Sequence, residues 1–102
     1  GSQLPLTSGS AARVIAAFAE ITIDGATFSQ DDVDAAKRAG YSESVEEREA
    51  GLASVSAPIM DANGQLAAVL SISGSADRFK PSPYEKFGTQ LLEAAGKLSA
   101  GI

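Results

Sequence analysis

The segment from residue 52 to residue 75 constrains the fold of this chain more than any other feature. Two runs of β-branched and small residues flank Asp61-Ala62-Asn63-Gly64, and this pattern predicts a β-hairpin. A two-residue turn at Asn63-Gly64 fixes which residues face each other across the two strands. The serines pair as Ser54 with Ser73 and Ser56 with Ser71.

The same pairing divides the hairpin into a hydroxyl face and an aliphatic face. The aliphatic face carries Val55, Ala57, Ile59, Ala68, Leu70 and Ile72. Because one face of an antiparallel sheet usually packs on a core, we expect helices to cover this aliphatic surface. The hairpin therefore predicts a mixed α/β (α+β) fold.

A second turn geometry stays open at this point. Ala62-Asn63-Gly64 can form a three-residue loop with a bulge at the glycine, which shifts the pairing by one residue. A shift of one residue turns one strand over relative to the other, so Ser71 and Ser73 would share a face with Val55. The even-length loop is favoured because it separates hydroxyls from aliphatic side chains.

Three helices and one further strand are expected around the hairpin. The first helix runs from about Ser8 to Ala19, where apolar residues recur at helical spacing after several possible serine and threonine caps. The second is capped by Ser29 and ends at Gly40, with acidic residues in its first turn and basic residues in its last. Tyr41 to Val45 is expected to be a short strand. A long C-terminal helix begins at Pro83, after the capping residue Ser82.

Composition limits what such a domain can do. The chain has 102 residues, 44% of them hydrophobic, which suits one globular domain. A net charge of −5 argues against contact with a nucleic acid backbone, and no stretch predicts a membrane span or a secretion signal, so the cytoplasm is the default location. With no His and no Cys, the usual metal ligands and catalytic bases are missing. We expect no enzyme, no metal and no cofactor.

An enzyme would have to use a carboxylate as its base. Glu43 or Asp61 would need to stand beside an activated serine with a strongly shifted pKa, and nothing in the sequence indicates this. A GxSxG nucleophile motif is also missing from the sequence.

An ordered set of short motifs resembles the effector-binding domain of IclR-type bacterial transcriptional regulators. The set covers nearly the whole chain from Leu4 onward. It comprises Arg38-Ala39-Gly40-Tyr41, Glu46-Glu47, Gly51, Ala57-Pro58, the Asp61–Gly64 turn and Leu70-Ser71-Ile72-Ser73-Gly74. The resemblance implies a GAF-like domain with a central hairpin, which binds a small metabolite, often an organic acid.

The resemblance also implies particular ligand contacts. Ser71 and Ser73 match the family's hydroxyl pair in the second hairpin strand. Ser54 and Ser44 stand at pocket positions where many members carry a cysteine and an acidic residue. Ser8, Gly9 and Ser10 match the N-terminus of a helix that contacts the ligand, where free N–H groups favour a carboxylate.

Three features of the chain depart from the family pattern. The family's DNA-binding winged helix-turn-helix and its opening strands are expected before residue 1, so residues 3–102 are expected to be a partial effector domain after a cloning scar at residues 1–2. DNA would be bound through the absent domain. The stretch between Phe18 and Ser29 is shorter than is usual, which predicts a more open pocket. The two substituted serines leave the identity of the effector open.

An interaction module is the alternative to a sensor. In that case the sheet edges and the terminal helix mediate a homodimer or homotetramer, and the pocket is vestigial. Sheet edges that lack a neighbouring strand favour such association.

Overall fold

A computed structural model describes residues 9–21, 25, 28–46 and 50–101 of the chain. In these residues three α-helices, one 3₁₀ helix and a three-stranded antiparallel sheet of order β1-β2-β3 are found. The elements are α1 (Ser10–Phe18), α2 (Gln30–Ala39), β1 (Ser42–Val45), β2 (Leu52–Met60), β3 (Leu66–Ser75), η1 (Ala76–Phe79) and α3 (Pro83–Ala100). The mixed α/β fold with a long C-terminal helix is confirmed.

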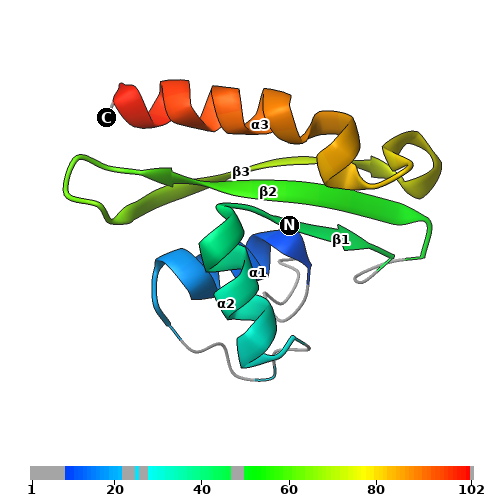
Figure 1. Cartoon of the computed structure of the whole chain (residues 1–102), viewed down its shortest axis with the longest axis horizontal. Coiled ribbons are helices and arrows are strands. Elements are labelled where there is room, and N and C mark those ends of the chain that lie inside the picture. Colours follow the sequence, from blue (N-terminus) through cyan, green and yellow to red (C-terminus); the bar gives the residue numbers. More distant parts are fainter. Residues whose placement is uncertain (1–8, 22–24, 26–27, 47–49, 102) are drawn as a thin grey trace, which may run out of the picture.

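The sheet lies between two layers of helix. Figure 1 shows α3 along one face of the β2-β3 hairpin, with α1 and α2 on the other side. Half of the stretch between Phe18 and Ser29 lies outside the described residues.

The first two helices are placed as predicted, with one change at the start. Ser29 caps α2 through a reciprocal capping box with Asp32, and Gly40 ends it in the left-handed region at a φ of 85°. Helix α1 begins at Ser10, and Gly9 occupies its N-cap position at a φ of 93°. The expected start at Ser8 lies outside the described residues.

The strand pairing of the hairpin is confirmed, although its turn was predicted wrongly. Ser54 pairs with Ser73 and Ser56 with Ser71. The turn, however, is the three-residue loop Ala62-Asn63-Gly64, because the Asp61 N–H donates to the Gln65 carbonyl at 2.8 Å. Gly64 has a φ of 77°, which a glycine adopts without steric cost.

A bulge reconciles this loop with the pairing of the strands. Met60 pairs with Leu66, but the next pair is Ile59 with Ala68, so Ala67 has no partner across the sheet. The extra residue restores the register that the odd-length loop had shifted. The serines and the aliphatic residues therefore keep opposite faces.

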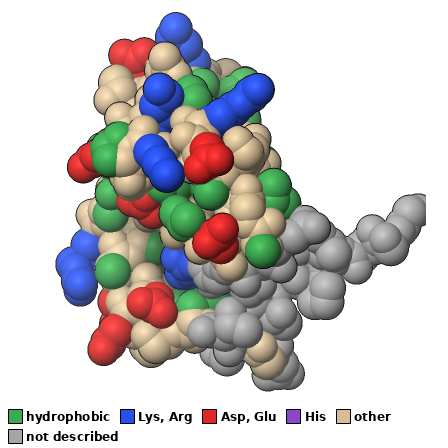
Figure 2. All heavy atoms as spheres, turned by 90° about the vertical axis from the view of Figure 1, so that its right-hand side faces the viewer, with side chains coloured by type: hydrophobic (Ala, Val, Ile, Leu, Met, Phe, Trp, Pro, Cys, Tyr) green, Lys and Arg blue, Asp and Glu red, His purple; other side chains and the backbone are tan. Residues whose placement is uncertain are grey.

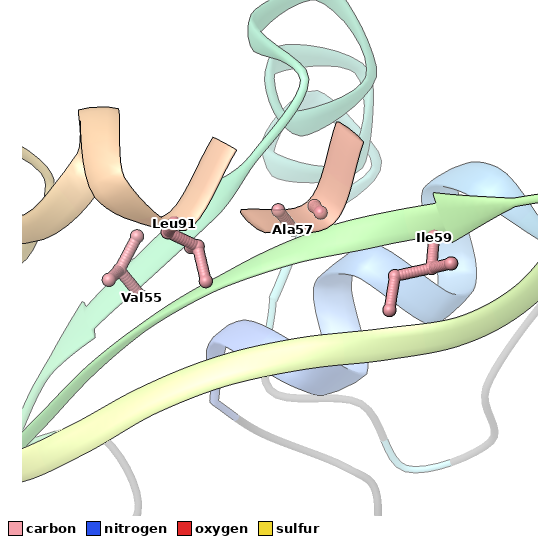
Figure 3. Packing of buried hydrophobic residues seen from close by; sticks show 5 residues of the cluster. Val55, Ala57, Ile59 and Leu91 are labelled. Atoms are coloured by element: carbon pink, nitrogen blue, oxygen red, sulfur yellow. The ribbon is translucent and has the colours of Figure 1, made fainter. Parts of the chain in front are cut away.

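The aliphatic face forms the core with α3. Val55, Ala57 and Ile59 of β2 are buried together with Leu91 and Ala95 of α3. Figure 3 shows Leu91 reaching down from the helix beside Val55, with Ala57 and Ile59 further along the strand. Leu70 and Ile72 of β3 pack against the same cluster. One helix, α3, thus covers this face as predicted, except at Ala68, which is exposed.

The capping box of α2 makes part of the stability dependent on pH. The backbone N–H of Ser29 donates to the Asp32 carboxylate at 2.9 Å, and this hydrogen bond lowers the pKa of Asp32 below its ordinary value near 3.8. A lowered carboxyl pKa stabilises the folded state above the unfolded-state pKa, and that stabilisation disappears as the pH falls through the folded-state pKa. The wild type should therefore melt at a higher temperature than Asp32→Asn. This difference in melting temperature should be largest above about pH 5 and should decrease below about pH 4.

Thermal unfolding between about pH 6 and pH 2 measures this effect. Asp31→Asn is the matched control, since Asp31 lies in the same first turn but outside the capping box. A difference between wild type and Asp32→Asn that stays constant over the whole range would contradict this role of Asp32.

Candidate functional site

Six serines form a regular array on the face of the sheet opposite the core. Each strand contributes two, and the register aligns them in two cross-strand rows. We call this array the serine grid; its rows are Ser44, Ser54 and Ser73, and Ser42, Ser56 and Ser71. Alternation along each strand places all six on one face.

Ser10 of α1 lies over the centre of the serine grid. Its Oγ is 2.7 Å from Ser54 Oγ and 2.7 Å from Ser56 Oγ. Ser54 Oγ is also 3.0 Å from Ser44 Oγ, and Ser56 Oγ is 2.6 Å from Ser71 Oγ. Helix α1 is thus joined to all three strands through one connected set of hydroxyls.

Exposure rises across the serine grid toward β3. Ser56 and Ser10 are 0% and 2% exposed, beneath and within α1. Ser44 is also buried, and Ser54 is half-buried. Ser71 and Ser73 on β3 are exposed. The β3 side is where a molecule from solution can reach the grid.

Arg13 is a charged residue beside the grid that the sequence reasoning missed. Its Nη1 donates to Ser42 Oγ at 3.2 Å and to the Glu43 carbonyl at 2.9 Å, so it joins α1 to β1. Partial burial lowers the pKa of Arg13, while the negative charges of Asp32 and Glu43 raise it. An arginine stays protonated at neutral pH. The spacing from Ser10 was the available signal, because residues three apart share a helix face.

The predicted site residues are placed as follows. The fold brings four of the predicted site residues into one hydrogen-bonded set: Ser10, Ser44, Ser54 and Ser71. Ser73 lies in the grid without a side-chain hydrogen bond inside the described part of the chain. Gly9 is the N-cap of α1, and Ser8 lies outside the described residues. Ser42 and Ser56, which were not among the candidates, complete the rows.

The two carboxylates weighed as catalytic bases have structural roles instead. Asp61 Oδ1 accepts the backbone N–H groups of Asn63 and Gln65 at 2.9 and 3.0 Å, which stabilises the hairpin loop. Glu43 Oε1 accepts the backbone N–H of Tyr84 at 3.4 Å. By strand alternation the Glu43 side chain lies on the opposite sheet face from the serine grid.

Other classes of site receive no support from the described residues. No group of three or more acidic, His or Cys side chains is arranged there to hold a metal ion. No described helix is both long and apolar enough to cross a bilayer. On the face shown in Figure 2, basic and acidic side chains are interspersed instead of forming one basic surface.

Tyr41 and Phe79 pack against other rings, whereas the two basic side chains beside Phe79 lie at the surface. The ring of Tyr41 stacks on that of Tyr84, with centroids 3.9 Å apart. Phe79 is buried and meets Phe87 edge to face. Arg78 and Lys80 are exposed.

Fold and grid together define an α/β domain with a polar, hydroxyl-lined sheet face. The family model described as bacterial transcriptional regulator IclR C-terminal matches residues 11–100. The chain therefore belongs to the IclR family of bacterial transcriptional regulators, whose C-terminal domain it represents.

Individual relatives agree with this assignment. The transcriptional regulator BhcR of Paracoccus denitrificans is 31% identical over 85 residues, which cover 83% of this chain but 30% of BhcR. An IclR-family regulator from Rhodococcus sp. has a similar structure, with a TM-score of 0.82, 27% identity, and coverage of 95% of this chain and 43% of its own. The inducer-binding domain of PobR from Acinetobacter shares the fold at a TM-score of 0.78 and 21% identity, covering 97% and 67% of the two chains. These relatives are regulators and not enzymes.

Proposed function

We propose that this chain is an effector-sensing domain that binds a small organic acid at the exposed end of the serine grid. The observation that carries the proposal is the array itself, in which Ser71 and Ser73 present hydroxyls to solvent from a rigid sheet. A hydroxyl can donate and accept hydrogen bonds, so it can hold a carboxylate without a direct ion pair.

The surroundings of the grid favour an anion. Arg13 places a positive charge beside it, and the N-terminus of α1, with Ser10 at its start, carries the positive end of the helix dipole. PobR, which shares the fold, has been solved as an inducer-binding domain with 3-hydroxybenzoic acid bound. A carboxylic acid is therefore the class of effector that we propose for this chain.

The regulatory output lies in a DNA-binding domain that these residues do not include. We propose that effector binding here modulates DNA binding by a winged helix-turn-helix elsewhere in the regulator, in the cytoplasm, and that the protein works as a homodimer or homotetramer. The matched residues cover 30% of BhcR and 43% of the Rhodococcus regulator, so the chain spans less than half the length of these relatives.

Removing the hydroxyl of Ser71 or of Ser73 should weaken effector binding. Ser71→Ala and Ser73→Ala each take away one donor and leave the bound acid with an unsatisfied oxygen. The expected loss of binding free energy is about 1 to 3 kcal/mol. Ser73→Ala should leave the stability of the domain largely unchanged, whereas Ser71→Ala also takes the hydrogen-bond partner from the buried Ser56 and should still fold. Isothermal titration calorimetry with an acid identified by screening measures it.

Ser75→Ala is the matched control for these two variants. Ser75 is an exposed serine on the same strand and the same sheet face, opposite Leu52 and beyond the two rows of the grid. It should bind the effector as the wild type does. If Ser71→Ala and Ser73→Ala both bind the effector with unchanged affinity, the serine grid is not part of the effector site.

One observation favours a second candidate function, an oligomerisation module with a vestigial pocket. The hydroxyls of Ser10, Ser54 and Ser56 already bond to one another, so the folded state needs no ligand to pair them. Because a sensor of this kind is also proposed to be oligomeric, the response of the melting temperature to small acids distinguishes the two functions, and light scattering reports the oligomers. Stable oligomers, together with no change in melting temperature across a library of small carboxylic acids, would favour the module over the sensor.

A further inference from the structure

Hydrogen bonds between hydroxyls join Ser10 and four serines of the grid into a single unbranched chain. In order along the chain these are Ser44, Ser54, Ser10, Ser56 and Ser71. Each hydroxyl has one proton to donate but can accept twice. Four hydrogen bonds among five hydroxyls therefore leave one O–H group without an acceptor inside the chain.

Burial decides where the surplus O–H group lies. All other hydroxyls must donate toward the residue that carries it, because each can donate only once. At Ser56 or Ser10, which are 0% and 2% exposed, an O–H group without an acceptor would be costly. Ser44 is buried as well, and its side chain bonds only to Ser54 within the described residues. Of the five, Ser71 alone is exposed.

We propose that the chain is directional, with every hydroxyl donating toward β3, so that Ser71 presents an outward O–H group polarised by the four hydrogen bonds behind it. Hydrogen bonds in a series strengthen one another. This inference rests on the proposed function, and it specifies which group the effector must offer. Ser71 selects a hydrogen-bond acceptor, best an anionic oxygen, and disfavours an ammonium or another pure donor.

The direction also gives the buried serines a role in binding. Ser10 joins the β1 half of the chain to the β3 half. It touches no exposed part of the site, yet it polarises Ser71 through Ser56. We therefore assign Ser10 as a positioning residue for the effector.

The rate of proton exchange at each serine hydroxyl shows the direction of donation along the chain, and its measurement requires no effector. In an equal mixture of H₂O and D₂O, a serine whose hydroxyl proton exchanges slowly gives two resolved ¹³Cβ NMR signals. In the ligand-free chain we expect two signals for each of the four hydroxyls that donate within the chain, and one averaged signal for Ser71; the four are Ser44, Ser54, Ser10 and Ser56. The opposite pattern, with Ser71 split and Ser44 averaged, would overturn the proposed direction, and averaged signals at all five would overturn the chain itself.

A variant at the junction gives an independent reading of the same direction. In Ser10→Ala the hydroxyl of Ser54 loses its acceptor, whereas Ser56 still donates to Ser71. We expect the splitting to be lost at Ser54 and kept at Ser56, and the reverse would overturn the proposal. Ser75→Ala should leave the wild-type pattern intact. Should Ser10→Ala not fold, the wild-type pattern still decides the direction.

Sodium acetate, with acetamide as the neutral molecule of the same shape, tests the acceptor preference. Acetate should slow exchange at Ser71 and split its ¹³Cβ signal, while acetamide at the same concentration should leave it averaged. An unsplit Ser71 in saturating acetate would overturn anion recognition by this hydroxyl. The pattern without acetate requires no effector, so the two proposals can fail separately. Hydroxyls that donate in the reverse direction would not contradict the proposed sensing function. Effector titrations that show no binding would not contradict the hydrogen-bond chain.

Discussion

Leu91→Ala is expected to lower the free energy of unfolding by about 2 to 5 kcal/mol, the range for a leucine deleted from a packed core. Leu91 is 1% exposed and contacts the cluster of Val55, Ala57 and Ile59. All three neighbours belong to β2, the central strand, and its hydrogen bonds to β1 and β3 limit how far it can move into the space that the leucine leaves. Leu91 is therefore a central contact between α3 and the sheet.

Leu98→Ala on the same helix is the control for Leu91→Ala. Leu98 is 49% exposed, so its truncation should change the stability by about 0.5 kcal/mol or less. Urea unfolding followed by circular dichroism measures both variants. Equal losses in the two variants would mean that α3 does not pack on the aliphatic face as described.

Gly88→Ala is expected to destabilise the domain by about 1 to 3 kcal/mol, although alanine is the better helix former. A methyl group at this buried glycine would overlap the ring of Tyr84, with Cε1 at 2.6 Å and Cγ at 2.8 Å. The ring would have to turn away and lose its stacking on Tyr41. That stack connects α3 with the residue just before β1.

Gly96→Ala on the same helix should change the stability in the opposite direction. A methyl group there meets no atom within 4 Å, so the gain in helix propensity of about 1 kcal/mol should be realised. Thermal and urea unfolding of the pair measure the two signs. If Gly88→Ala also stabilises the domain, the close approach of Tyr84 to the helix backbone is wrong.

A spectroscopic readout locates the effect of Gly88→Ala at the tyrosine stack. Burial raises the pKa of Tyr41, and Glu43 and Tyr84 raise it further. Displacing Tyr84 should therefore lower the pKa of Tyr41 toward its ordinary value of 10.0. Ultraviolet titration of the variant and the wild type measures this change, and an unshifted titration would place the damage elsewhere.

The strand register was predictable from the sequence, whereas the turn was not, because different forces determine them. The separation of hydroxyls from aliphatic residues is a long-range requirement of burial, and it fixed Ser54 opposite Ser73. The loop follows local chemistry, in which Asp61 accepts two backbone N–H groups and Gly64 adopts a positive φ. The strand pairing that burial requires and the pairing that the loop sets differ by one residue. The bulge at Ala67 supplies that extra residue. No local sequence signal marked that alanine.

The candidate site was predictable only in part for a related reason. Strand alternation places the serines of the hairpin on one face, and the family resemblance added Ser44. The position of α1 over the grid, which buries Ser10 and Ser56, depends on packing between distant segments. Arg13 was missed because its contacts to Ser42 and Glu43 join two such segments. The sequence therefore indicated the exposed end of the site better than its buried half.

Native mass spectrometry of the chain, titrated with a library of small carboxylic acids, tests the sensing function most directly. We expect at least one acid to form a complex of one molecule per chain, and the complex should be lost in the Ser71→Ala/Ser73→Ala double variant while Ser75→Ala retains it. A folded chain that binds none of the acids, or an acid complex that survives the double variant unchanged, would contradict effector sensing at the serine grid.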